Sequence, residues 1–169
     1  MHILGAFMTA AACLGLGLAC VQTKKLRIET LGGLCTALEL VRAELETRLM
    51  SLPELCSYLF KHLSGPAADF IRELGKSMEL LGEREFSALW QSAAENNLKG
   101  LTEAELDEMK NIGTVLGRCE LSEQTSALSA GLDFLRTGLE EARAAYPAER
   151  RLGIGVGLSS AALLILGLM

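Results

Sequence analysis

Charged side chains are missing from both ends of this sequence. The first 23 residues and the last 18 contain no Asp, Glu, Lys or Arg, so all 16 basic and 21 acidic residues lie between Lys24 and Arg151. A helix of about 20 apolar residues is long enough to span a bilayer. We therefore predict transmembrane helices at residues 1–23 and 152–169, with a polar domain at residues 24–151 between them.

Basic residues border both uncharged runs on the side of the central domain. Lys and Arg next to membrane helices stay in the cytoplasm, so the central domain is predicted to be cytoplasmic, with both termini on the far side. A signal peptide carries its positive charge before the apolar stretch, where this chain has only His2 and its amino terminus. Cleavage near Cys20, giving a secreted or lipid-anchored domain, is the less favoured alternative. The residues that set the topology are Lys24, Lys25, Arg27, Arg143, Arg150 and Arg151.

Residues that commonly build active sites are also scarce. The chain has 2 His, and its net charge of −5 argues against a nucleic-acid interface, which needs a basic surface. A zinc site or a nucleophile–base pair needs converging His or Cys side chains, and His62 is expected on the exposed side of its helix. The glycines of residues 153–157 lack the Lys-Ser/Thr pair of a phosphate loop. We expect no enzyme activity, no cofactor and no metal site.

The cysteines are expected to serve as small apolar residues. They form no CxxC pair, and a cytoplasmic domain keeps its thiols reduced. Burial is the usual fate of free cysteine. The five are Cys13, Cys20, Cys35, Cys56 and Cys119.

Strand-forming residues are rare between Lys24 and Arg151, where Leu, Ala and Glu dominate, so an all-α fold is predicted. Apolar residues at spacings of three and four predict a bundle of about six helices. The first runs from Lys24 to Met50, and Thr102 with Glu105 forms a capping box that opens the fifth. Other helix starts and stops are expected at Ser51, Pro53, Pro66, Gly82, Asn97, Gly117 and Pro147. The inward residues of the short helices are Leu55, Leu59, Leu63, Phe70, Ile71, Leu74, Met78, Leu81, Phe86, Leu89, Trp90, Ala93, Leu106, Met109, Ile112 and Leu116.

The last helix has the most regular apolar stripe of the chain. Its positions alternate spacings of four and three, as in a coiled coil, and such a stripe needs a partner. They are Leu121, Thr125, Leu128, Leu132, Leu135, Leu139, Ala142 and Tyr146. The first helix carries a similar stripe at Leu31, Leu34, Leu38, Val41 and Leu45. We predict that these two helices pair antiparallel as a long stalk.

Two further groups of residues are candidates for contact with other molecules. Small residues recur at every fourth position of the uncharged runs, a pattern that lets membrane helices pack closely. They are Gly5, Thr9, Cys13, Gly17, Gly153, Gly157 and Ala161. Acidic residues gather where the fifth helix begins, where the helix dipole favours them; the alternative is a docking surface for a basic partner. They are Glu103, Glu105, Asp107 and Glu108.

Several short motifs occur in a characteristic order between the two uncharged runs. After the first run come Leu-x-x-Ala-Leu-x-Leu at residues 34–40, Glu44 with Glu46, Leu52-Pro53-Glu54, then Phe86, Leu89 and Trp90, and finally Leu116-Gly117-Arg118 with Gln124. Over essentially the whole chain, this order resembles the stage III sporulation protein AB family of endospore-forming bacteria.

The resemblance implies a place in a membrane complex that links the mother cell to the engulfed forespore. The soluble domain of that family is similar to the helical cytoplasmic domains of platform protein F in type II secretion and type IV pilus systems. A non-enzymatic platform subunit in the outer forespore membrane of the mother cell is implied, located between the cytoplasmic sporulation ATPase and other membrane subunits. The lipid bilayer is then a further partner, and nucleic acid is not. The alternative is a membrane-bound adaptor or regulator that binds a soluble partner through the acidic surface.

Overall fold

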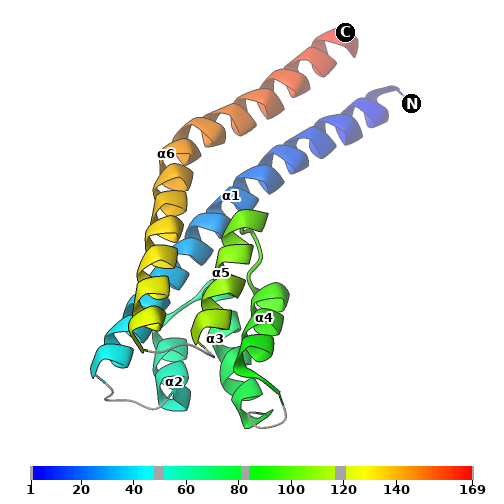
Figure 1. Ribbon diagram of the computed structural model, residues 1–169. Helices are drawn as coiled ribbons and strands as arrows, with labels where there is room; N and C mark the ends of the chain where they lie inside the picture. The colour runs from blue at the N-terminus through cyan, green and yellow to red at the C-terminus, as the bar shows by residue number, and fades with distance from the viewer. Residues whose placement is uncertain (1, 48–51, 81–83, 117–120, 169) are drawn as a thin grey trace. The chain divides into compact units, whose positions relative to one another are not determined.

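The computed structural model describes the backbone of residues 2–47, 52–80, 84–116 and 121–168. Within these ranges, side chains are described from position 19 to position 148, except at positions 20, 52, 53, 80 and 121. Figure 1 shows the helices in chain order: α1 (His2–Thr47), α2 (Leu52–His62), α3 (Gly65–Ser77), the 3-10 helix η1 (Met78–Leu80), α4 (Phe86–Asn97), α5 (Glu103–Leu116) and α6 (Leu121–Leu168). No strand occurs in these described ranges, so the all-α prediction is confirmed.

The chain divides into two compact units. One is Arg27–Glu140, and the other combines Met1–Leu26 with Glu141–Met169. Among the described residues, none of the helices has the length and hydropathy that a membrane crossing requires. The predicted spans stay predictions. The small residues predicted to pack there have side chains outside the described set; they are Gly5, Thr9, Cys13, Gly17, Gly153, Gly157 and Ala161.

Within the Arg27–Glu140 unit, α1 and α6 run antiparallel. Arg136 forms an ion pair with Glu39, and Arg42 Nη1 donates a hydrogen bond to Ser129 Oγ at 3.3 Å. Later residues of α1 therefore contact earlier residues of α6. The central positions of both predicted stripes are buried in one core, at Leu31, Leu34, Leu38, Val41, Leu128, Leu132, Leu135 and Leu139. Leu45, Thr125, Ala142 and Tyr146 are only partly buried. The antiparallel pairing is confirmed within this unit.

The four short helices complete the core of the unit. α3 packs against both α2 and α4, and α4 packs against α5, as the ribbon in Figure 1 shows. Their apolar stripes point inward as predicted at Leu55, Leu59, Phe70, Ile71, Leu74, Met78, Leu89, Trp90, Ala93, Met109 and Ile112. Each Å² of apolar surface that is buried stabilises the fold by about 25 cal/mol, so these stripes are the main source of stability.

Trp90 links α4 to α5 by a hydrogen bond. Its Nε1 donates a hydrogen bond to Met109 O at 2.6 Å, and its ring meets Phe70 edge-on with centroids 4.9 Å apart. A carbonyl oxygen has two lone pairs, so Met109 O is able to accept the indole as well as a helix amide. The approach depends on Gly113, because a Cβ atom there would overlap the Trp90 ring.

The helix boundaries agree with the sequence at α4 and α5 but not in α6. The capping box is confirmed: Thr102 N donates to Glu105 Oε2 at 2.8 Å, and Glu105 N donates to Thr102 Oγ1 at 3.3 Å. The prediction that Pro147 marks a helix end was wrong, since it lies inside α6. A proline removes one backbone donor, and a long helix keeps its hydrogen bonds on either side. The predictions for Ser51, Leu81, Gly82 and Gly117 fall outside the described residues.

Candidate functional site

The four acidic residues predicted as a partner surface differ in exposure. Glu103 and Asp107 are exposed, Glu108 is half-buried, and Glu105 is buried. The inclusion of Glu105 in an exposed surface was therefore wrong, because its carboxylate closes the capping box and pairs with Arg27. The exposed part consists of Glu103 and Asp107, and partner binding through them stays a prediction.

Glu105 and Arg27 form a largely buried ion pair that joins α5 to α1. Arg27 Nη2 donates to Glu105 Oε1 at 2.6 Å, while Arg27 Nε lies 3.2 and 3.3 Å from the two carboxylate oxygens. The Glu105 side chain is 3% exposed and the Arg27 side chain 21%. Gly138 of α6 leaves room for this pair, because a Cβ there would lie 2.7 Å from Glu105 Oε1. The pair thus joins α1 to α5 at a point where α6 packs closely against it.

The basic residues predicted to set the topology are also not equivalent. Lys24, Lys25 and Arg143 are exposed, whereas Arg27 is held by Glu105 within the helical body. The side chains of Arg150 and Arg151 lie outside the described residues. Sequence reasoning missed the structural role of Arg27, since its partner lies 78 positions away. Its role in topology stays a prediction.

The environment of Glu105 favours the ionised carboxylate. Burial alone raises the pKa of Glu105, but hydrogen bonds from Arg27 and Thr102 outweigh burial and hold the pKa below its ordinary value. A lowered pKa in the folded state means that ionised Glu105 stabilises the fold above the ordinary glutamate pKa. This contribution is lost as the pH falls through the lowered value.

Acid is therefore expected to destabilise the wild-type chain more than the Glu105→Gln variant. As the pH falls from about 5 to about 2, the melting temperature of the wild type should drop further than that of Glu105→Gln. The variant has no carboxylate at position 105, so it has no contribution from an ionised Glu105 to lose. Thermal unfolding followed by circular dichroism over this range measures the difference. Glu103→Gln, an exposed change on the same turn, is the matched control and should follow the wild type. Parallel curves for the wild type and Glu105→Gln would contradict the assigned role of Glu105.

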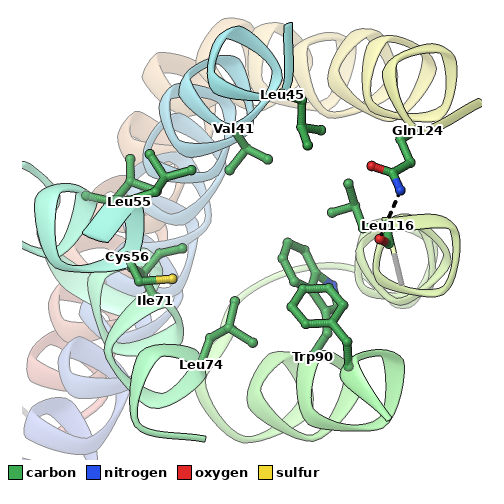
Figure 2. A pocket seen from close by; sticks show the side chains of 11 residues that line it. Val41, Leu45, Leu55, Cys56, Ile71, Leu74, Trp90, Leu116 and Gln124 are labelled. Carbon is green, nitrogen blue, oxygen red and sulfur yellow. Dashed lines mark hydrogen bonds between the residues drawn. The ribbon is translucent and has the colours of Figure 1, made fainter. Parts of the chain in front are cut away.

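An apolar pocket of about 270 Å³ lies within the Arg27–Glu140 unit. All six α-helices contribute to its lining, and Figure 2 shows the side chains around it. Gln124 of α6 donates a hydrogen bond from Nε2 to Leu116 O at 3.3 Å, which ties the start of α6 to the end of α5 at this pocket.

The remaining candidate reactive groups with described side chains are two buried cysteines and one exposed histidine. Within the described residues, no group of three or more His, Cys, Asp or Glu is placed to hold a metal ion. Cys35 and Cys56 are buried as predicted, and burial raises the pKa of Cys56 to about 11. The predictions for Cys13, Cys20 and Cys119 concern side chains outside the described set. His62 is exposed as predicted, and its Nδ1 lies 2.8 Å from Tyr58 O.

Comparison with protein families assigns the whole chain. A family model described as stage III sporulation protein AB matches residues 2–169. The chain belongs to the stage III sporulation protein AB family. The resemblance stated from the sequence is thereby confirmed, and with it membership of a sporulation family. Comparisons with curated proteins and with solved structures gave no match.

Four of the residues that carry the resemblance to the stage III sporulation protein AB family meet at the pocket. Phe86 and Trp90 come from α4, Leu116 from α5, and Gln124 from α6. From the sequence, Phe86, Trp90 and Leu116 were also predicted to point inward from their helices, whereas Gln124 served only as a marker of order along the chain. Leu116 and Gln124 lie at the end of one predicted helix and near the start of the next, which was the one signal for their proximity. Nothing in the spacing indicated a cavity.

Proposed function

We propose that this chain is a platform subunit of the sporulation membrane complex, without enzyme activity of its own. In this role the uncharged ends at residues 1–23 and 152–169 span the membrane, and the helical body lies in the mother-cell cytoplasm. The body holds the sporulation ATPase next to other membrane subunits. Family membership supports the role in sporulation, and the length and composition of the two ends support the anchors.

The observation that carries the proposal is the extent of α1 and α6. α1 begins in the first uncharged run and continues to Thr47, while α6 begins at Leu121 and continues through the second run to Leu168. The same helices supply the buried Leu stripes of the Arg27–Glu140 unit. In both helices the residues that join the uncharged run to the body are helical, so no loop separates them. This feature favours a platform over a domain on a loose tether.

The direct test is recovery of the tagged full chain from sporulating cells in mild detergent, followed by mass spectrometry. We expect the sporulation ATPase and other membrane subunits to be recovered at constant ratios. Recovery of the chain alone, despite good solubilisation, would contradict the platform proposal. Recovery with an unrelated soluble partner would instead favour the adaptor alternative.

Charge reversal on α5 tests the predicted partner surface. The double change Glu103→Lys and Asp107→Lys should reduce recovery of the soluble partner that binds this surface about tenfold. Exposed charges at an interface speed association with a partner of opposite charge and disfavour a partner of the same charge. Recovery of membrane subunits should not change. The matched control is Glu73→Lys with Glu79→Lys, two exposed acidic positions on α3 and η1. Equal effects of the two double variants would exclude a specific α5 surface.

A further inference from the structure

The pocket of the Arg27–Glu140 unit is a defined cavity in the bundle. Its inner wall is buried, with Leu59 and Trp90 only 1% and 3% exposed. Leu45, Phe86, Leu116 and Gln124 also line it and are partly exposed, so the cavity is not closed on every side. Figure 2 shows that side chains from opposite helices are directed at the same space.

Among the residues that the structure describes, no charged side chain lines this cavity. Gln124 is the one amide among its described lining residues, and that amide donates a hydrogen bond to Leu116 O. The Cys56 thiol on the opposite wall is neutral at physiological pH, because burial raises its pKa. A charged ligand would lose its hydration here without meeting an opposite charge, which is strongly unfavourable. The lining therefore selects an uncharged, apolar occupant.

The volume sets the size of that occupant. An apolar cavity of about 150 Å³ in another protein stays dry and binds benzene. In proportion, the 270 Å³ available here has room for about ten carbon atoms. The volume also lies close to the lower limit of about 300 Å³ for ligand pockets, which share this mostly apolar lining with a few polar groups.

We propose that this cavity binds one small, uncharged apolar molecule of about ten carbon atoms, either aliphatic or aromatic. This binding site goes beyond the platform function and does not depend on it. Because six helices converge on the cavity, the site exists only in the folded body. A bound ligand consequently stabilises the body against unfolding.

Trp90 supplies a direct readout of occupancy, since it lines the cavity and is the only tryptophan of the chain. Bromooctane is a suitable probe because its bromine quenches tryptophan emission only on close contact. With the full chain in phosphatidylcholine vesicles, we expect quenching of Trp90 that saturates with bromooctane concentration. ω-Bromooctanoate carries the same chain and bromine with an added carboxylate, and should give no saturable quenching.

Filling the cavity tests whether the quenching arises there. Leu116→Phe and Leu45→Phe add volume at partly exposed positions of the lining and should each weaken bromooctane binding at least about tenfold. Leu106→Phe, on α5 but not in the lining, is the matched control and should bind like the wild type. Circular dichroism identifies any variant that fails to fold. If one filling variant does not fold, the other one still tests whether bromooctane binds in the cavity. Unsaturable quenching, equal quenching by ω-bromooctanoate, or equal quenching in the folded filling variants would overturn the proposal.

Discussion

Replacing Gly113 with alanine is expected to lower the free energy of unfolding of the helical body by about 3 kcal/mol, at the upper end of overpacking effects. The added methyl group would overlap the Trp90 ring. Moving that ring would disturb its contacts with Phe70 and Phe86, whose ring centroids lie 4.9 and 5.8 Å away. Displacing it also breaks the hydrogen bond from Trp90 Nε1 to Met109 O and leaves a buried donor unsatisfied.

Urea titration of the full chain in mild detergent, followed by the helical circular dichroism signal, measures this loss. Gly75→Ala is the matched control, since a Cβ there would lie 3.4 Å from Cys56 Cβ in ordinary contact. Alanine is favoured over glycine in helices by up to about 1 kcal/mol, so Gly75→Ala should be neutral or stabilising. In a Trp90→Phe background, Gly113→Ala should cost less because the smaller ring leaves room. Equal losses at both glycines would contradict the steric explanation.

Local patterns in the sequence were sufficient to predict most of the helices. The stop at Asn97 and the capping box of Thr102 and Glu105 depend on residues within one turn of each other, and both are found as predicted. The apolar stripes of α1 and α6 identified the buried Leu residues because helix periodicity places them on one face. Periodicity also indicated that these two helices pair.

Contacts between distant parts of the chain could not be derived in this way. Arg27 was assigned to the membrane boundary and Glu105 to an exposed surface, each from its neighbours in sequence. Both assignments overlooked a contact across 78 positions, for which charge spacing along the chain gives no signal. The same holds for Gly113, whose missing side chain matters only because Trp90 of another helix lies against it.

The cavity and the course of α6 show a second reason for failure. A cavity is space left by six helices together, so no single stripe encodes it, and its lining residues look like ordinary core residues in the sequence. Pro147 was taken as a helix end because proline lacks an amide donor. The helix instead continues to Leu168, so the cost of this proline, about 3 kcal/mol from the lost hydrogen bond and the ring clash, does not end it.

Arg27→Met is expected to lower the free energy of unfolding by about 3 kcal/mol, because it leaves the buried Glu105 carboxylate without its cation. Thr102 N still donates to Glu105 Oε2, but one amide does not replace three guanidinium contacts. Arg42→Met is the matched control on the same helix. Arg42 is exposed, and both its ion pair with Glu46 at 3.9 Å and its hydrogen bond to Ser129 Oγ at 3.3 Å lie at the surface, where such contacts contribute little.

The double variant Arg27→Met with Glu105→Gln separates the stranded charge from lost packing. Glutamine keeps an oxygen for Thr102 N and is uncharged, so the capping box persists while the desolvated carboxylate is gone. We expect the double variant to be more stable than Arg27→Met alone, since replacing both partners of a buried pair is far less damaging than removing one. Urea titration of the four chains, including the wild type and Glu105→Gln, gives the coupling energy directly. A double variant less stable than either single change would mean that Arg27 acts mainly through the packing of its methylene groups between α1, α5 and α6, and not through its charge.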